Sequence, residues 1–401
     1  MTQTNSITRI VERANQVLMS TYARTSVAFE RGQGCRIWDQ DGKVYLDFLA
    51  GIAVTALGHS HPRVIETIIG QAEKLLHTSN LYQIENQIAL AEILVKHSFA
   101  DKAFFCNSGT EANEGAIKLA RRFATERYGP EKTDILAMIN SFHGRTLGSL
   151  SATGQIKFQK GFGPLLPGFS FVPFDDLEAL DRAWEDSVCA VMMEPVQGEG
   201  GIRVPHKDYL KEVKKRCRER QALLILDEVQ TGLGRTGTLF CHEQFGVQPD
   251  IMTLAKALGN GLPIGALLAS DEVAAAFQPG NHAATFGGNH LVTAVAGTVL
   301  SIMVEEGFLP AAREKGEYFK NQLQGLKEEF PQILEVRGLG LLLGLALDRP
   351  GKPFVDACLE KGFLINCTQD TILRFAPPLM VETGEIDALI KALRELFKEC
   401  R

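Results

Sequence analysis

The chain has 401 residues, about 2.7 times the ~150 residues typical of one domain, so we expect two domains. Hydrophobic residues make up 45% of it and charged residues 22%, a balance that excludes a mainly disordered chain. The formal net charge is −6 and the sequence contains no basic block, which argues against nucleic acid or an anionic membrane as the partner. We therefore expect the partner to be a small molecule.

No segment has the pattern of a membrane span or of a secretory signal. The longest apolar run, residues 338–347, is much shorter than the roughly 20 residues that a membrane helix needs, and it predicts a buried strand. The polar N-terminus lacks the apolar stretch of a signal peptide, so we expect a cytoplasmic protein. The eight cysteines form no CxxC pair, which predicts reduced, buried thiols and no metal site.

In chain order, the first element is a helix, because the apolar residues between Ile7 and Leu18 follow helical spacing. Residues 36–38 and 44–46 flank Asp41-Gly42 as the strands of a hairpin would. From residue 102, short apolar runs alternate with amphipathic stretches, which is typical of a mostly parallel α/β sheet. These runs are residues 103–106, 135–139, 189–193, 222–226 and 250–254.

The chain ends in an amphipathic helix, predicted from the apolar spacing between Ile386 and Phe397. We find no internal repeat and no low-complexity linker. We predict a small α/β domain formed by residues 1–62 and 296–401, which encloses a large α/β domain of residues 63–295.

Polar residues follow each of the five central runs. They are Asn107 to Thr110, Phe142 to Arg145, Glu194-Pro195, Asp227-Glu228 and, shortly after the fifth run, Lys256. In an open α/β sheet the ligand lies outside the carboxyl ends of the strands, so these residues are expected to face one crevice.

The run from Ser108 to Glu111 has the form of a capping box, with Ser108 as the N-cap and Glu111 at the third helical position. A helix that starts here offers unpaired N–H groups, and Gly109 allows close approach to the backbone. These features suit a phosphate. A helix that is simply well capped is the alternative, because caps of this kind are common.

Residues 223–228 place Asp227 and Glu228 at the end of a buried strand, as in the Walker-B strand of an ATPase. No GxxxxGK[ST] motif exists to hold the phosphates, which argues against nucleotide hydrolysis. Residues 232–237 match GxGxxG, but no convincing helix follows them, so a dinucleotide site is also disfavoured. The remaining interpretation is an ionised Asp227 that pairs with a cationic nitrogen of a ligand.

Lys256 is the single charge in an apolar stretch, where a lysine commonly extends to solvent. A desolvated lysine instead has a lowered pKa and can form a Schiff base. A phosphate cradle at Gly109-Thr110, the aromatic Phe142, a buried Asp227 and the Lys256 amine in one crevice together suit pyridoxal 5'-phosphate.

These residues identify a resemblance to the class-III aminotransferases, which have the aspartate-aminotransferase fold (fold type I). The most specific motifs are FCNSGTEANEGAIKLAR, FHGRTLG, EPVQGEGG, LDEVQTGLGRTG and TFGGN, and the resemblance covers nearly the whole chain. It implies a large, mostly parallel sheet domain, a small α/β domain from both chain ends, and bound pyridoxal 5'-phosphate.

The family's roles carry over to matching positions. Lys256 resembles the lysine that carries the cofactor and then shuttles the proton, and Asp227 the partner of the pyridine nitrogen. Thr285, in TFGGN, resembles a phosphate-binding threonine of the second subunit, which implies a homodimer with shared sites. The other implied cofactor contacts are Ser108, Gly109, Thr110, Phe142, Val229 and Gln230.

Arg145 and Arg374 resemble the two arginines that bind substrate carboxylates, and Glu199 the carboxylate that shields Arg374. Ala284 stands where many relatives have a serine near the acyl group, and Ile52 where ornithine-specific relatives have a tyrosine.

Within the family, residues 47–54 and 77–82 most resemble enzymes that move the terminal amine of N2-acetylornithine to 2-oxoglutarate in arginine biosynthesis. Ornithine, 4-aminobutyrate, succinylornithine and succinyl-diaminopimelate are alternative amine donors. An aminomutase on the same fold and a non-enzymatic binding protein are further alternatives.

Three histidines are not assigned to the chemistry. His59 and His61 have no third metal ligand nearby in the sequence, so a turn before a helix at Pro62 is the better interpretation. His143, beside Phe142, is expected to be a structural hydrogen-bonding residue rather than a general base.

Overall fold

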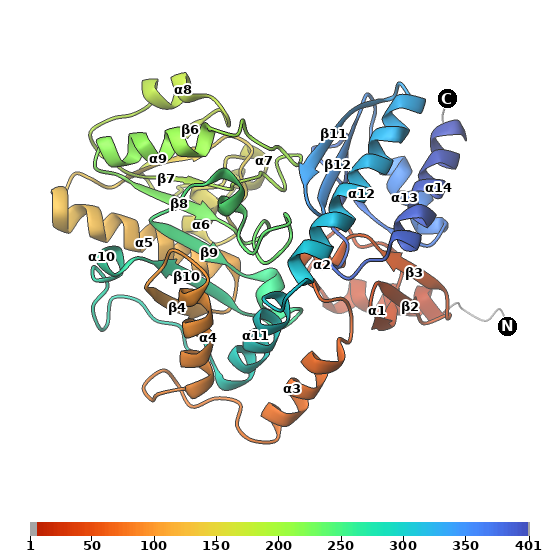
Figure 1. Ribbon diagram of the computed structural model, residues 1–401, viewed down its shortest axis with the longest axis horizontal. Coiled ribbons are helices and arrows are strands. Elements are labelled where there is room, and N and C mark those ends of the chain that lie inside the picture. Colours follow the sequence, from red (N-terminus) through yellow and green to blue (C-terminus); the bar gives the residue numbers. More distant parts are fainter. Residues whose placement is uncertain (1–5, 400–401) are drawn as a thin grey trace.

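The computed structural model describes residues 6–399, and its centre is a seven-stranded sheet (Figure 1). The strand order is β4-β10-β9-β8-β7-β5-β6. All neighbours are parallel except β10, which runs antiparallel to β9 and β4. The bounds are β4 Lys102–Cys106, β5 Asp134–Met138, β6 Phe169–Val172, β7 Val188–Met193, β8 Leu223–Asp227, β9 Ile251–Leu254 and β10 Gly265–Ala269. The predicted mostly parallel sheet is confirmed.

Both faces of this sheet are buried, which is why its strands appear as continuous apolar runs in the sequence. Adjacent residues of β5 point to opposite faces. Ile135 packs in a core with α5 (Gly109–Tyr128), whereas Leu136 packs in a core with α9 (Tyr209–Glu219). The sequence did not predict β6 or β10, because one is only four residues long and the other is rich in glycine and alanine.

Two four-stranded sheets lie to the right of the central sheet in Figure 1. The first has the order β1-β2-β3-β13 and the second β11-β12-β15-β14. Strand β13 pairs in parallel with β3, so the two ends of the chain share a sheet. The domain boundaries at residues 62 and 295 stay a prediction. The bounds are β1 Phe29–Gln33, β2 Arg36–Asp39, β3 Val44–Asp47, β11 Ile333–Leu339, β12 Leu342–Leu347, β13 Phe363–Leu364, β14 Asn366–Thr368 and β15 Ile372–Phe375.

The prediction of one buried strand over residues 338–347 is wrong. Strand β11 ends at Leu339, the chain turns, and β12 begins at Leu342 as its antiparallel neighbour. Gly338 and Gly340 have φ angles of 113° and 53°, which glycine adopts without the steric cost that other residues have there. Glycine therefore permits a turn inside a run that is apolar throughout. The predicted hairpin at Asp41-Gly42 is present as β2 and β3.

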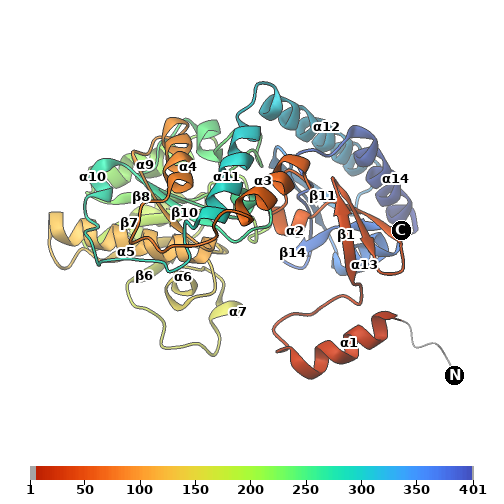
Figure 2. The ribbon, with the colours of Figure 1, turned by 90° about the horizontal axis from the view of Figure 1, so that it is seen from below.

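The predicted terminal helices are also present. Helix α1 (Ser6–Val17) stands away from the body of the protein, and α14 (Thr383–Glu399) packs beside α12 (Phe308–Glu329) (Figure 2). The other helices are α2 Ala50–Ala53, α3 Pro62–Ala72, α4 Glu85–Lys96, α6 Leu147–Ser151, α7 Ile156–Gln159, α8 Leu177–Arg182, α10 Asp271–Ala274, α11 His290–Met303 and α13 Lys352–Glu360, with short 3-10 turns η1 Cys241–Phe245 and η2 Lys256–Gly259.

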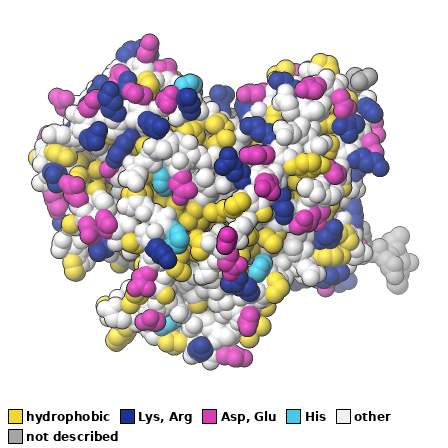
Figure 3. All heavy atoms as spheres, in the orientation of Figure 1, with side chains coloured by type: hydrophobic (Ala, Val, Ile, Leu, Met, Phe, Trp, Pro, Cys, Tyr) yellow, Lys and Arg dark blue, Asp and Glu magenta, His cyan; other side chains and the backbone are white. Residues whose placement is uncertain are grey.

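Within residues 6–399, no single helix is long and apolar enough to cross a membrane; α11 and α12 meet those criteria only as a pair, bent by 71°. Acidic and basic side chains are interspersed over the face in Figure 3. The described cysteines are free, and all are buried except the half-buried Cys367. Burial raises the pKa of Cys106 and Cys189 to about 12, as expected of unreactive thiols; Cys400 lies outside the described residues.

Candidate active site

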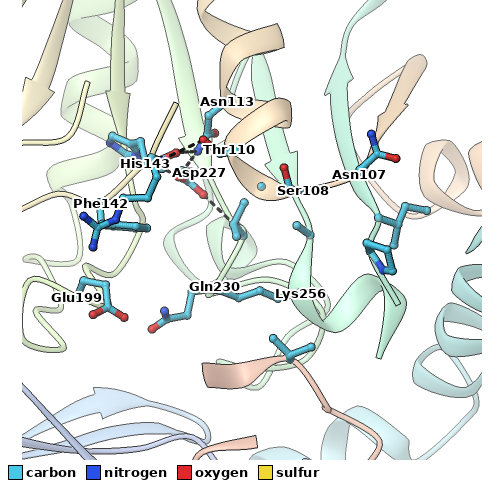
Figure 4. A pocket seen from close by; sticks show the side chains of 18 of the residues that line it. Asn107, Ser108, Thr110, Asn113, Phe142, His143, Glu199, Asp227, Gln230 and Lys256 are labelled. Carbon is cyan, nitrogen blue, oxygen red and sulfur yellow. Dashed lines mark hydrogen bonds and ion pairs between the residues drawn. The ribbon is translucent and has the colours of Figure 1, made fainter. Parts of the chain in front are cut away.

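A cavity of about 430 Å³ lies at the carboxyl ends of the central strands (Figure 4). Ten of the predicted site residues line it: Ser108, Gly109, Thr110, Phe142, Arg145, Glu199, Asp227, Val229, Gln230 and Lys256. They come from five separate segments of the chain, and the order of the strands brings these segments together.

Helix α5 points its N-terminus at the cavity. Ser108 Oγ accepts a hydrogen bond from Glu111 N at 3.3 Å, as the capping motif predicted. The reciprocal bond differs from a capping box, because Glu111 Oε2 accepts from Asn107 N at 2.6 Å and not from Ser108 N. The N–H groups of Gly109 and Thr110, in the first turn, have no partner within the helix. They are available to an anion at the positive end of the helix dipole.

Gly109 allows the helix to approach the loop after β8. A Cβ atom at this position would lie 2.7 and 2.8 Å from the two methyl groups of Val229. The sequence suggested that Gly109 admits a ligand close to the backbone. The structure adds a steric reason, which is the contact between α5 and Val229 that forms one wall of the cavity.

Asp227 ends β8 and is buried, with 3% of its surface exposed. Its Oδ2 accepts from Asn113 Nδ2 and from His143 Nδ1, both at 2.8 Å, and its Oδ1 accepts from Val229 N at 3.0 Å (Figure 4). These three donors match an ionised carboxylate, which only accepts hydrogen bonds. Asn113 was not singled out from the sequence, and His143 was expected to be structural. Both line the cavity.

Lys256 begins the 3-10 turn after β9, and its side chain lies in the cavity wall. Burial lowers the pKa of its amine below the usual 10.5, against the opposing attraction of Glu199 and Asp227. A lysine with a lowered pKa is more often unprotonated at neutral pH, and is then a nucleophile and a proton acceptor.

Glu194 is a further titratable group of the cavity, noted in the sequence as a strand end but given no role. Burial raises its pKa to about 7, although His143 lowers it. Its two oxygens accept from Phe142 N at 3.1 Å and Gly198 N at 3.0 Å. The only signal in the sequence was its position directly after β7.

Arg374, on β15, reaches toward the cavity from the second small sheet. Its guanidinium is 1% exposed and donates to Glu199 Oε1, to Asn366 Oδ1 at 3.0 Å and to Gln230 Oε1 at 3.4 Å. Burial alone would raise the pKa of Glu199, but the charge and hydrogen bond of Arg374 bring it below the usual value. The other predicted arginine, Arg145, is exposed at the cavity wall.

Aromatic rings hold Arg145 in place. Its guanidinium carbon lies 4.0 Å from the ring centre of Phe158 and 5.5 Å from that of Phe142. Contacts of this kind favour a cation over an aromatic face. Phe142 and Phe158 in turn pack edge to face at 5.8 Å.

Three predicted residues do not line the cavity of their own chain. Thr285 is exposed and Ala284 half-buried, in the loop before α11. Ile52 is 41% exposed and has a φ angle of 68°, within residues 50–53, where every φ angle is positive. This left-handed turn is sterically costly for residues other than glycine, and the chain then places Val54 in the cavity wall.

The expected turn at His59 and His61 is present. His59 Nε2 lies 2.8 Å from Asp47 Oδ2, and His61 precedes α3, which starts at Pro62. No group of three or more potential metal-ligating side chains occurs in the part of the chain that the structure describes.

The cavity's polar groups fit a phosphorylated pyridine aldehyde. The first turn of α5 offers N–H groups to a phosphate, the buried Asp227 carboxylate suits a protonated ring nitrogen, and the Lys256 amine suits an aldehyde. Phe142 and Val229 provide apolar surface for a ring.

Comparisons with known proteins place the chain in one family. The family model of the class-III aminotransferases matches residues 18–397. An acetylornithine aminotransferase of Methanocaldococcus jannaschii is 53% identical over 385 residues, which are 96% of each chain. The crystal structure of ornithine aminotransferase from Toxoplasma gondii has a TM-score of 0.95 at 34% identity, over 100% of this chain and 97% of that one. That of N-acetylornithine aminotransferase from Stenotrophomonas maltophilia has a TM-score of 0.84 at 37% identity, over 98% and 100%.

Proposed function

We propose a substrate and a cofactor for this chain, which belongs to the class-III aminotransferases. The predicted family and the predicted fold type are therefore confirmed. We infer that the chain moves the terminal amine of N2-acetylornithine to 2-oxoglutarate, with pyridoxal 5'-phosphate as cofactor. The products are N-acetylglutamate 5-semialdehyde and glutamate, as in arginine biosynthesis.

The observation that carries the proposal is the presence of an amine of lowered pKa, a buried carboxylate and a helix N-terminus in one cavity. When bound, pyridoxal phosphate supplies a ring that stabilises negative charge at the carbon from which a proton is removed. Asp227 would hold the proton on the ring nitrogen, Phe142 and Val229 would cover the ring, and Gln230 would donate to its phenolic oxygen. Ser108, Gly109 and Thr110, at the start of α5, would bind the phosphate.

Lys256 both anchors the cofactor and moves the proton. Burial lowers the pKa of its amine, so Nζ can accept the proton from the substrate carbon. The same nitrogen can then deliver that proton to the carbon that was the aldehyde carbon of the cofactor. No other base is needed at the substrate carbon. His143 is not the base that removes this proton, because its Nδ1 is bound to Asp227.

Two arginines sort the substrates by their carboxylates. Arg145 binds the α-carboxylate of the amine donor, far from the reacting amine. Arg374 binds the α-carboxylate of 2-oxoglutarate or glutamate, and Glu199 covers Arg374 while the uncharged chain of the terminal-amine donor is bound. This exchange avoids a desolvated, unpaired guanidinium in either half of the reaction.

The acyl group is assigned from Ile52 and from the relatives. Free ornithine carries an α-ammonium that needs a polar partner, whereas the neutral acetamide of N2-acetylornithine costs less to desolvate beside an isoleucine. The 53% identity to a protein named acetylornithine aminotransferase supports this choice over ornithine. Ala284 makes the acetyl contact looser, so succinyl analogues are expected to be accepted.

A homodimer with shared sites completes the proposal. Asn80 Nδ2 donates to Gly287 O at 2.9 Å and to Ala284 O at 3.2 Å, which fixes the loop of Thr285 against residues 77–82. This surface exposes large hydrophobic side chains, namely Leu81, Tyr82 and Phe286. Exposed apolar side chains that cluster in this way are suited to a second copy of the chain.

The test is a panel of amine donors with 2-oxoglutarate, run with wild-type protein and with Lys256→Ala. We expect the highest kcat/KM with N2-acetylornithine, and almost no turnover by the alanine variant. A wild-type preference for ornithine or 4-aminobutyrate would overturn the substrate, and an active Lys256→Ala variant would overturn the role of Lys256. Reaction without any oxo-acid acceptor would favour an aminomutase.

A further inference from the structure

The orientation of Asp227 depends on side chains from other elements. Asn113 lies in the second turn of α5 and His143 in the loop after β5, and both donate to Asp227 Oδ2. Among the described residues, Oδ1 accepts only from Val229 N. Oδ2 thus has its two lone pairs occupied, while Oδ1 keeps one for a further donor.

A hydroxyl group on the neighbouring strand sets the orientation of the Asn113 amide. Thr253 Oγ1, on β9, donates to Asn113 Oδ1 at 2.7 Å. On the other side, Asn113 Nδ2 donates to Asp227 Oδ2 at 2.8 Å and to His143 O at 2.7 Å. Turning the amide over would place its oxygen against these two acceptors, so only one orientation satisfies the network.

His143 supports the carboxylate through one ring nitrogen. Its side chain is fully buried, and Nε2 has no hydrogen-bond partner among the described residues. The contact of Nδ1 with Asp227 Oδ2 is thus the only hydrogen bond that the ring makes within residues 6–399, and it fixes the side of the carboxylate that His143 occupies.

We propose that Thr253, Asn113 and His143 are positioning residues, which keep Asp227 ionised and aim its free lone pair at the ring nitrogen of pyridoxal phosphate. The chain of contacts joins β9, α5, β8 and the loop after β5 (Figure 4 shows the contacts at Asp227). The inference rests on the proposed function, because it assumes that cofactor. The other charged groups that act on this cluster are Glu194 and Lys256.

Asn113→Asp is the sharpest test, because it keeps the shape and replaces the donor by a second carboxylate. Two carboxylates this close cannot both be ionised, so they would share one proton. We expect the calorimetric dissociation constant for pyridoxal phosphate to rise roughly 10- to 100-fold, in line with the loss of a charge-assisted hydrogen bond. The ¹⁵N shift of cofactor labelled at the ring nitrogen should move toward its unprotonated value. Asn86→Asp, on α4, is the matched control and should behave like wild type.

Thr253→Val tests the same network at a residue that contacts Asn113 and not Asp227 itself. This test remains valid even if Asn113→Asp fails to fold. The substitution keeps the shape of the buried side chain and removes only the hydroxyl that orients Asn113. We expect the dissociation constant and the ¹⁵N shift to change in the same direction as in Asn113→Asp, but by less. Thr293→Val is its control, because Thr293 is equally buried on α11 and donates to Asn289 O instead.

The outcomes separate this inference from the proposed function. If wild-type protein does not bind pyridoxal phosphate, the proposed function is wrong. If wild-type protein binds it and Thr253→Val has a wild-type dissociation constant and a wild-type ¹⁵N shift, the positioning network is wrong. The network would also be contradicted if the ¹⁵N shift changed as much in the control variants as in Asn113→Asp and Thr253→Val.

Discussion

Arg374 and Glu199 form an ion pair in which the guanidinium is 1% exposed and the carboxylate 28% exposed. The two residues are 175 positions apart in the chain, on β15 and in the loop after β7. Glu199 is the partner nearer to solvent, so it can move outward while a substrate carboxylate takes its place on the buried guanidinium. Glu199 is therefore suited to be displaced when a substrate carboxylate binds Arg374.

Glu199→Gln should slow the half-reaction with N2-acetylornithine more than the half-reaction with glutamate. The variant leaves Arg374 without an anion while the terminal-amine donor is bound, and we expect a loss of about 10-fold or more in that half alone. Single-turnover absorbance of the bound cofactor measures each half separately. Glu317→Gln, whose carboxylate is exposed on α12, is the control. Equal slowing of both halves would contradict the exchange.

Glu194→Gln should change how stability depends on pH. The pKa of Glu194 is raised to about 7, so the folded state keeps a proton that the unfolded state loses above the usual value of 4.5. The stabilisation that protonated Glu194 gives the folded state is fully present below pH 4.5 and is lost as the pH rises to about 7. Glutamine does not titrate, so the variant does not lose stability in this way. The difference in free energy of unfolding, variant minus wild type, should therefore rise by about 3 kcal/mol across this pH range.

Urea unfolding at pH 5 and pH 8 checks the Glu194 prediction. The amide adds a constant offset, because it cannot accept from both Phe142 N and Gly198 N, so only the change with pH is diagnostic. Glu328→Gln, at an exposed position of α12, should follow wild type. Parallel curves for Glu194→Gln and wild type would show that the raised pKa is wrong.

Hybrid dimers test whether Thr285 serves the site of the other subunit. A dimer of one Lys256→Ala chain and one Thr285→Ala chain should have one site with both substitutions and one site with neither. Such hybrids should regain about half of the wild-type activity per dimer. The measurement is turnover by hybrids separated with two different affinity tags. Hybrids that are no more active than either parent would mean that each chain supplies its own Thr285.

Ile52 should determine the choice between N2-acetylornithine and ornithine. Discrimination by an unpaired polar group can reach about 10⁴-fold, and partial exposure of Ile52 reduces it toward tens. We expect wild type to prefer N2-acetylornithine and Ile52→Tyr to narrow the ratio of the two kcat/KM values. Ile65→Tyr, at a similarly exposed isoleucine on α3, should leave the ratio unchanged. An unchanged ratio in Ile52→Tyr would remove Ile52 from the substrate site.

Much of the site was predictable because its residues follow strands directly. Asp227 comes at the end of β8, Ser108 and Gly109 begin α5 shortly after β4, and Lys256 follows β9. In a parallel sheet such positions meet at one edge, so the sequence order alone brings them to a common crevice. Burial on both faces also made these strands visible as apolar runs. The hairpin turn at Gly340 was missed, because an apolar run does not reveal where glycine reverses the chain.

The contacts that tune these residues could not be predicted from spacing. Asn113 lies 114 positions from Asp227, His143 lies 84 positions from it, and Thr253 lies 140 positions from Asn113. Nothing in the local pattern distinguishes Asn113 from any other polar residue of an amphipathic helix. The sequence by itself determined the elements and the reactive groups at their ends, because hydrophobic period and chemical type are local. Only the tertiary structure decided which groups pair, because burial and hydrogen bonding are set by neighbours that the sheet order brings together.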